Sequence, residues 1–160
     1  LYKRPANLFV AGFLGDPPIN LQPCRGAVRD GVPGVEALDA FLPADLGSGG
    51  ESREWEGKEF VLGIRPEDIG VAKSGSGAPG IPAVVDVIEH LGSSALVHVR
   101  TEASRTKLTA LVHAKWIPEA GERVLLDLHA GNGLLFDKTT TLAVPGFAFR
   151  QPAEPAGIGS

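Results

Sequence analysis

The sequence predicts a mainly β fold, a barrel or sandwich of about eight short strands. Glycine and proline, with 21 and 13 copies, make up about a fifth of the 160 residues, and both punctuate a chain with turns. Apolar and polar residues alternate in short segments, most regularly over residues 95–100, as they do in a half-buried strand. The sequence has no strand–helix–strand pattern of the kind that would indicate a parallel sheet. These observations together favour a closed or stacked antiparallel fold.

The first predicted strands cover residues 21–29 and, with a weaker pattern, 35–42. We expect a turn at Gly31-Val32-Pro33-Gly34 between them. Residues 43–59 are rich in glycine, serine and charge, and we expect a loop there. The apolar run 60–64 predicts a buried strand that ends at Arg65-Pro66.

The most regular stretch predicts a hairpin, with strands over 83–91 and 95–100 joined by Gly92-Ser93-Ser94. In a regular pleat Glu89 would share the apolar face of Val85 and Val87, which is unfavourable for a carboxylate without a partner. We therefore expect either a bulge that turns Glu89 outward or a partner for it. A loop over 73–80 precedes the hairpin, and further strands are expected at the segments 108–112, 124–128 and 134–136.

The two ends of the chain differ from this β region. Residues 1–18 predict a short helix and a linker, with Phe9 and Phe13 four apart on one apolar side. Such a helix is marginal alone, so we expect these two side chains to dock on another surface. Residues 19–150 are expected to form one domain, and 151–160 a disordered tail. Because the chain opens on Leu1 and contains no methionine, we interpret it as a fragment or a trimmed chain.

Composition and motifs exclude several classes of function. A net charge of −4 and 6% aromatic residues argue against nucleic-acid binding. No apolar run approaches the ~20 residues of a membrane span, and Gly57-Lys58-Glu59 lacks the spacing of a phosphate-binding P-loop. His90 and His98 fall on neighbouring strands without a metal-ligand pattern. We therefore expect no catalytic, cofactor or metal site in this chain.

Two single residues allow a structural and a functional reading. Cys24 beside Arg25 is either a buried thiol, the favoured reading, or a reactive one. Arg65 precedes Pro66, which favours an extended backbone at Arg65 and a turn at Glu67-Asp68. That corner is a rigid structural feature, an interface, or both.

The segment Gly63-Ile64-Arg65-Pro66-Glu67-Asp68 resembles the GIRPE-type motif in the regulatory domain of the ATPase subunits of maltose-type ABC importers. Three further segments agree in order along the chain. The opening residues 1–20 resemble the last helix and exit linker of the ATPase domain. Residues 87–92 resemble the family's VVE-x-LG hairpin, and Gly121-Glu122 with the later residues 134–137 resembles its closing GE…HLFD stretch. Leu134 stands where histidine is common in the family.

This resemblance implies an OB-like β-barrel of the TOBE or MOP-like type, here with a short N-terminal helix. It implies a regulatory and dimerisation domain of an importer for sugars or related small solutes. ATP and Mg²⁺ would bind in a separate nucleotide-binding domain, and the whole subunit would lie in the cytoplasm at the inner face of the membrane. Implied partners are a second copy, the other transporter subunits and a regulatory protein, whose receiving surface includes Gly63 and Glu89. Candidate interface residues are thus Gly63, Arg65, Pro66, Glu67, Glu89 and Gly92.

A rival reading is a free-standing barrel that binds a small oxoanion. Such a site needs several backbone N–H groups and hydroxyl or lysine side chains that converge. Ser93 and Ser94 beside Gly92 offer two hydroxyls. A nucleic-acid-binding OB fold is the second rival, and the charge and aromatic content count against it.

Overall fold

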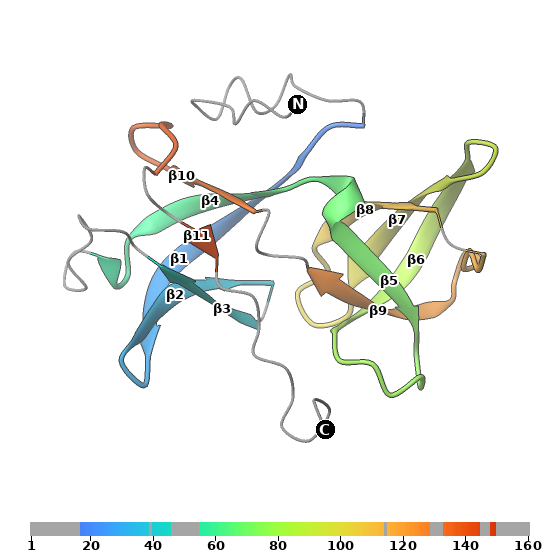
Figure 1. Ribbon diagram of the computed structural model, residues 1–160, viewed down its shortest axis with the longest axis horizontal. Coiled ribbons are helices and arrows are strands. Elements are labelled where there is room, and N and C mark those ends of the chain that lie inside the picture. The colour runs from blue at the N-terminus through green and yellow to red at the C-terminus, as the bar shows by residue number, and fades with distance from the viewer. Residues whose placement is uncertain are drawn as a thin grey trace.

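The computed structural model describes residues 17–38, 40–45, 55–113, 115–128, 133–144 and 148–149. In this part of the chain two antiparallel sheets lie beside each other along the long axis (Figure 1). The first sheet has the order β10-β4-β1-β2-β3-β11 and the second β5-β9-β6-β7-β8. The strands of the first sheet are β1 (Asn20–Arg29), β2 (Val32–Ala37), β3 (Ala40–Asp45), β4 (Glu59–Ile64), β10 (Leu134–Asp137) and β11 (Ala148–Phe149). Those of the second are β5 (Ile69–Lys73), β6 (Ile81–His90), β7 (Ala95–Thr101), β8 (Lys107–Val112) and β9 (Arg123–Leu128).

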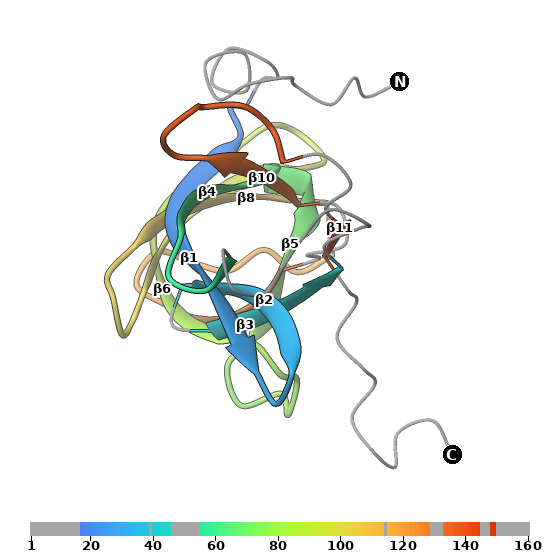
Figure 2. The ribbon, with the colours of Figure 1, turned by 90° about the vertical axis from the view of Figure 1, so that its left-hand side faces the viewer.

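The second sheet curls until its two edge strands meet. β5 and β8 contact each other, and the short 3₁₀ helix η2 (Pro66–Asp68) lies against β8. Seen end on, the strands surround a common interior (Figure 2). The described residues are thus mainly β, as the sequence pattern predicted, and form the OB-like barrel that the family resemblance implied.

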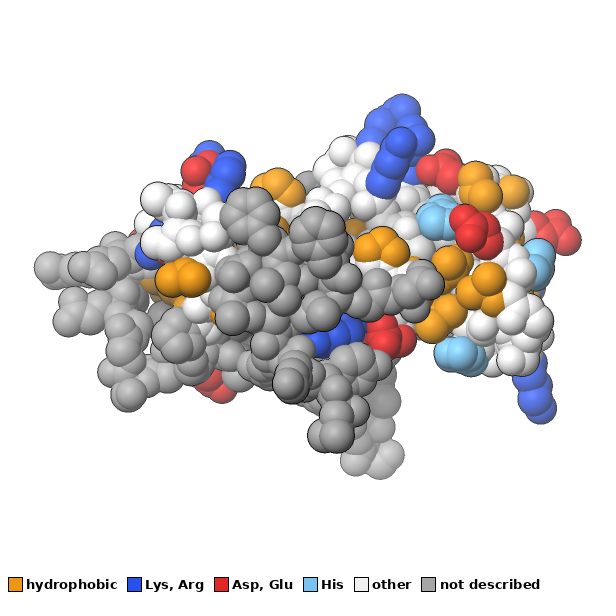
Figure 3. Space-filling view, turned by 90° about the horizontal axis from the view of Figure 1, so that it is seen from above, with side chains coloured by type: hydrophobic (Ala, Val, Ile, Leu, Met, Phe, Trp, Pro, Cys, Tyr) orange, Lys and Arg blue, Asp and Glu red, His pale blue; other side chains and the backbone are white. Residues whose placement is uncertain are grey.

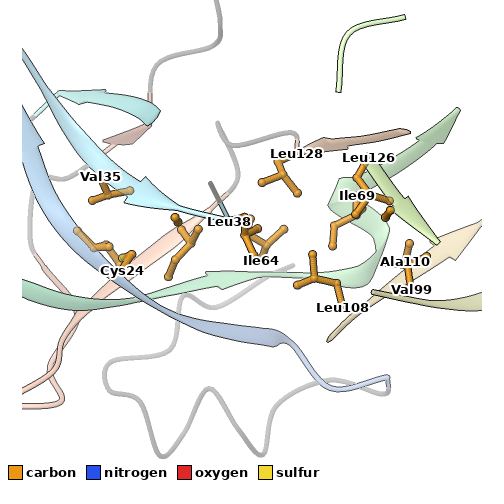
Figure 4. Packing of buried hydrophobic residues seen from close by; sticks show 14 of the residues in the cluster. Cys24, Val35, Leu38, Ile64, Ile69, Val99, Leu108, Ala110, Leu126 and Leu128 are labelled. Atoms are coloured by element: carbon orange, nitrogen blue, oxygen red, sulfur yellow. The ribbon is translucent and has the colours of Figure 1, made fainter. Parts of the chain in front are cut away.

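One hydrophobic core runs through both sheets. β4 turns Phe60, Leu62 and Ile64 into it, and β7 adds the fully buried Val97 and Val99. Figure 4 shows its side chains in a row, from Cys24 and Val35 in the first sheet to Val99 and Ala110 in the second. Because the core is shared, the two sheets form one packed body rather than two separate ones.

A smaller cluster lies on the opposite face of β4. It consists of Val61, Leu134 and Phe136, with Ile19 and Leu21 packed against it. Phe136 is fully buried there. The strands β4 and β10 are therefore apolar on both faces, which explains the continuous apolar runs of their sequences.

The turn predicted at residues 31–34 is wrong. The reversal is a two-residue hairpin turn at Asp30 and Gly31, whose φ angles are 51° and 78°, and Arg29 pairs with Val32 directly beyond it. Positive φ at both central residues is the geometry that an Asp-Gly pair favours between antiparallel strands. Pro33 and Gly34 accordingly belong to β2.

The regions predicted as one weak strand over 35–42 and as a loop over 43–59 also need correction. They contain two strands, β2 and β3, and the chain reverses direction between them at Leu38, whose φ is 54°. Residues 43–45 belong to β3. Trp55 is buried, and its indole N–H donates to the carbonyl of Gly34 at 2.6 Å. Residues 46–54 lie outside the described part. The glycine and serine content there obscured the structured residues on either side.

The strand β5 went unpredicted, because Gly70, Ala72 and Lys73 give it a weak apolar pattern. It is stabilised by pairing with β9 along its whole length. The helix expected in residues 1–18, with Phe9 and Phe13, lies almost entirely outside the described residues, as does the tail 151–160. Within the described residues, no helix is long and apolar enough to span a membrane.

Candidate interaction surface

The segment from Gly63 to Asp68, here called the motif corner, links the two sheets. Arg65 follows β4 with φ −71° and ψ 147°, the extended conformation predicted from the proline after it. Pro66 is buried, Glu67 is exposed, and the N–H of Asp68 donates to the carbonyl of Arg65 at 2.9 Å. The turn expected at Glu67-Asp68 is the 3₁₀ helix η2, which leads into β5 and lies against β8. The corner is therefore a structural joint with Glu67 on its outer side.

Gly63 is buried beneath neighbouring side chains. A Cβ atom at this position would lie 3.0 Å from Cδ1 of Ile19 and 3.3 Å from Cε2 of Phe136. The glycine therefore allows the segment entering β1 to cross close over β4. Its own atoms contribute to this packing rather than to the outer surface.

A β-bulge sets the faces of the β6–β7 hairpin. The register shifts between Val85 and Val87, so that Val85 pairs with Val99 while Val87 pairs with His98. Asp86 is the extra residue, and beyond it Val87 and Glu89 point outward. Both alternatives predicted for Glu89 hold together, because the bulge turns it outward and a partner, His98, lies across the strand.

Glu89 and His98 form a hydrogen-bonded pair on the outer face. Oε1 of Glu89 lies 3.1 Å from Nε2 of His98, and Nδ1 of His98 lies 3.0 Å from the hydroxyl of Thr109 on β8. The Glu89 side chain remains 56% exposed. Its carboxylate is thus held in one orientation while still open to a partner.

Apolar side chains surround this pair. Val87 and Leu91 are 54% and 52% exposed, and the half-buried Leu96 and Leu111 lie on the same face. Figure 3 shows a histidine and an acidic side chain in contact, with hydrophobic side chains around them. We call this surface the hairpin face and define it by Val87, Glu89, Leu91, Leu96, His98 and Leu111.

The tip of the hairpin also depends on a glycine. Gly92 has a φ of 82°, and the N–H of Leu91 donates to the carbonyl of Ser94 at 2.8 Å. Side chains other than glycine are strained at that φ. Gly92 therefore shapes the loop that carries Leu91. Ser94, one of the two hydroxyls considered for an oxoanion site, is 9% exposed.

Ion pairs border the hairpin face toward the β7–β8 loop. Nε of Arg100 lies 3.4 Å from Asp86, and Nε of Arg123 lies 3.2 Å from Glu102. Both pairs are substantially exposed, and such pairs add little stability. They supply charge of both signs at the edge of an otherwise apolar surface.

The remaining candidate groups do not form a reactive site. Burial, offset in part by a hydrogen bond with the Leu62 backbone, raises the pKa of Cys24 from 9.0 to about 12, so the buried-thiol reading is confirmed. His90 pairs with Ala95 while both ring nitrogens of His98 are engaged elsewhere. No group of three or more His, Cys, Asp or Glu side chains in the described part could hold a metal ion.

The structure separates the predicted interface residues into two groups. Gly63, Arg65, Pro66 and Glu67 belong to the corner, whereas Glu89 and Gly92 belong to the hairpin. Sequence reasoning missed His98 as the partner of Glu89, and Thr109 as the second partner of His98. The cross-strand register was the signal that could have revealed them, because the alternation of residues 95–100 already placed His98 on the outer face.

The fold and this surface define a small OB-like barrel with a polar pair set in an apolar face. A family model described as the TOBE domain matches residues 62–136. Residues 62–136 therefore form a TOBE domain, and the resemblance to the regulatory domain of ABC importer ATP-binding subunits, drawn from the motifs, is confirmed.

The sequence relatives agree. The sn-glycerol-3-phosphate import ATP-binding protein of Escherichia coli strain K12 is 36% identical over 140 residues, which cover 88% of this chain and 37% of that protein. A protein of the same description from Agrobacterium fabrum is 32% identical over 140 residues, 88% of this chain and 35% of that protein. The chain thus spans little more than a third of the length of these relatives.

Among solved structures, a cytoplasmic molybdate-binding protein, ModG, has a TM-score of 0.52 and 15% sequence identity. The match covers 72% of this chain and 94% of that protein. At this identity the likeness concerns the fold, and it agrees with the OB-like assignment.

Proposed function

We propose that this chain is the regulatory and dimerisation domain of the ATP-binding subunit of an ABC importer for sugars or related small solutes. The observation that carries the proposal is the alignment of 88% of the chain with import ATP-binding proteins at 36% identity. The domain itself performs no catalysis in this account. It holds two subunits together and receives regulatory signals through its surface.

The proposal assigns the chemistry to another part of the natural protein. ATP and Mg²⁺ bind in a nucleotide-binding domain that precedes residues 19–150, and residues 1–18 lead from that domain into this one. The complete subunit pairs with a second copy and with the membrane subunits of the importer. It therefore works in the cytoplasm, at the inner face of the membrane.

The names of the relatives point to one solute to test first, sn-glycerol-3-phosphate. The full-length protein that carries this chain is expressed in an E. coli strain lacking its own sn-glycerol-3-phosphate import ATP-binding protein. Restored uptake of the radiolabelled solute supports the transporter assignment. If the protein is expressed but uptake of this solute is not restored, sn-glycerol-3-phosphate is ruled out as the solute that it serves in this strain.

The hairpin face is the surface on which we place a regulatory protein. Its exposed carboxylate lies among Val87, Leu91, Leu96 and Leu111, so it fits a partner that presents a lysine or arginine flanked by apolar side chains. Glu89→Arg reverses the central charge and should abolish inhibition of uptake in cells grown under repressing conditions. Glu102→Arg, at a neighbouring ion pair, is the matched control and should leave inhibition intact. Equal inhibition of both variants would remove the hairpin face from the account.

A small-oxoanion binder is the alternative, and the fold shared with the molybdate-binding protein favours testing it. Titration calorimetry of the 160-residue chain with molybdate, and with sulfate as a comparison, decides this point. The regulatory-domain proposal expects no heat of binding at micromolar to millimolar anion. Stoichiometric binding of molybdate would favour the alternative.

A further inference from the structure

A row of hydrogen bonds runs from the hairpin face into the seam between the two sheets. Beyond Glu89 and His98 it reaches Thr109, whose backbone N–H donates to Oδ1 of Asn20 at 2.8 Å. The side-chain amide of Asn20 donates to the carbonyl of Thr109 at 2.9 Å and to the carbonyl of Ile64 at 3.1 Å. The row thus connects the second sheet with β1 and β4 of the first.

Each hydrogen bond of this row can be assigned a donor and an acceptor, starting from Glu89. A carboxylate only accepts hydrogen bonds, so Nε2 of His98 donates to Glu89. In neutral His98 the other nitrogen, Nδ1, then accepts from the Thr109 hydroxyl. The orientation of Glu89 is therefore linked to the tautomer of His98 and to the rotamer of Thr109.

The inner end of the row lies where the chain enters the barrel. Asn20 is the first residue of β1, and Ile64 lies between Gly63 and Arg65 of the motif corner. A second side chain of β1 acts in the same way, since Nε2 of Gln22 donates to the carbonyl of Lys107 at 3.3 Å. Side chains of β1 thus bond the backbone of β8 along the seam, in the place where a neighbouring strand would bond it.

We propose that the row Glu89–His98–Thr109–Asn20 couples the hairpin face to the entry of the chain into the barrel. While Glu89 is bonded to His98, the start of β1 is held against β8 by the hydrogen bonds between Thr109 and Asn20. A partner cation that engages Glu89 competes with His98 and loosens this hold, which changes the placement of the residues preceding β1. This inference rests on the proposed function, because it supplies a route from a regulator on the hairpin face to the domain upstream.

The test measures amide hydrogen exchange by NMR in the 160-residue chain, without any partner. The reporter is the Thr109 N–H, normalised to the amide of Val124 in the core so that global stability cancels. Glu89→Ala removes the outer hydrogen bond and should speed exchange at Thr109 about threefold to tenfold, the range expected for the loss of one hydrogen bond. Glu89→Gln keeps an acceptor oxygen and should restore slow exchange.

Two controls make the result specific. Glu102→Ala removes an exposed carboxylate of another ion pair and should leave Thr109 unchanged. In a His98→Phe background, where the row is already interrupted, Glu89→Ala should add nothing. The coupling is overturned if Glu89→Ala leaves Thr109 unchanged, if it acts equally in the His98→Phe background, or if Glu102→Ala has the same effect.

The exchange experiment and the uptake experiments can fail independently of each other. Failure of the exchange experiment removes the route but leaves the hairpin face as a docking surface. Failure of the uptake experiment with Glu89→Arg removes the regulator from this face, whereas the exchange experiment still reports whether the row is coupled.

Discussion

Gly63 illustrates how one residue serves packing within a motif that also has a functional interpretation. The resemblance implies that this glycine belongs to a regulator's receiving surface, while the structure buries it beneath Ile19 and Phe136. Any influence on a partner is therefore indirect, through the position of the entering segment over β4. Of the two residues that the resemblance assigns to this receiving surface, Gly63 and Glu89, only Glu89 is exposed.

Gly63→Val should lower the free energy of unfolding by about 1–3 kcal/mol, because the added carbons meet a close-packed cluster. Gly63→Ala adds a single carbon and should have a smaller effect. Urea denaturation of the two variants measures the difference. Replacing Ile19 by alanine in the valine variant should recover part of the loss, and a valine variant as stable as the wild type would contradict the packing role.

Asp137 organises the turn after β10. Its Oδ1 accepts from the backbone N–H groups of Thr139 and Thr140 at 2.8 and 3.0 Å, and Oδ2 lies 2.9 Å from Nζ of Lys58. The Thr140 N–H, then the Lys58 ammonium, lower the pKa of Asp137 below its ordinary 3.8. The ionised side chain therefore stabilises the folded state.

The stability that Asp137 contributes should depend on pH in a definite direction. Because its pKa is lower in the folded than in the unfolded chain, the contribution is present above pH 3.8 and disappears as the pH falls through the folded value. The gap in urea midpoint between wild type and Asp137→Ala should therefore close in acid. A gap that stays constant from neutral to acid pH would show that the carboxylate charge is not involved.

At the scale of elements, Trp55 fills the interior of the first sheet. It donates to the carbonyl of Gly34, and its ring packs against that of Phe60 in a tilted arrangement, with centroids 4.6 Å apart. The turn that follows is bonded to β1, since the N–H of Gly57 donates to the carbonyl of Gly26 at 2.8 Å. The Trp55 side chain thus connects the segment before β4 to the core of the first sheet.

Trp55→Ala should cost about 3–5 kcal/mol of stability, the range for truncating a buried aromatic residue. Trp55→Phe keeps ring packing and loses the hydrogen bond, so it should cost less. Thermal denaturation followed by circular dichroism measures both. Trp116→Phe, on a half-buried tryptophan, is the comparison, and equal losses at the two positions would contradict the special role of Trp55.

The strands that the sequence predicts well are those with a strong local signal. The β6–β7 hairpin and β4 follow from alternation or from an apolar run, because their faces match the layers that they separate. β5 and β3 carry weak patterns and form through pairing with β9 and β2, which local sequence does not reveal. The contacts of Glu89 with His98, and of His98 with Thr109, depend on the register of three strands, so only the folded structure identifies them.

At the scale of the whole molecule, the shared core makes the described part of the chain one packed body that joins an entry point to an exposed face. Asn20 lies at the entry, and Glu89 lies on the hairpin face. Such a body suits a domain that transmits binding at its surface to a neighbouring domain, since packed cores move as units.

The most direct test of the central claim is the mass and peptide map of the natural polypeptide that carries this sequence. An antibody raised against the chain isolates it from its source cells for mass spectrometry. We predict a protein at least twice the 16.7 kDa of this chain, with a phosphate-binding P-loop sequence upstream of Leu1. A natural protein of 16.7 kDa would contradict the account and would favour a free-standing binding barrel.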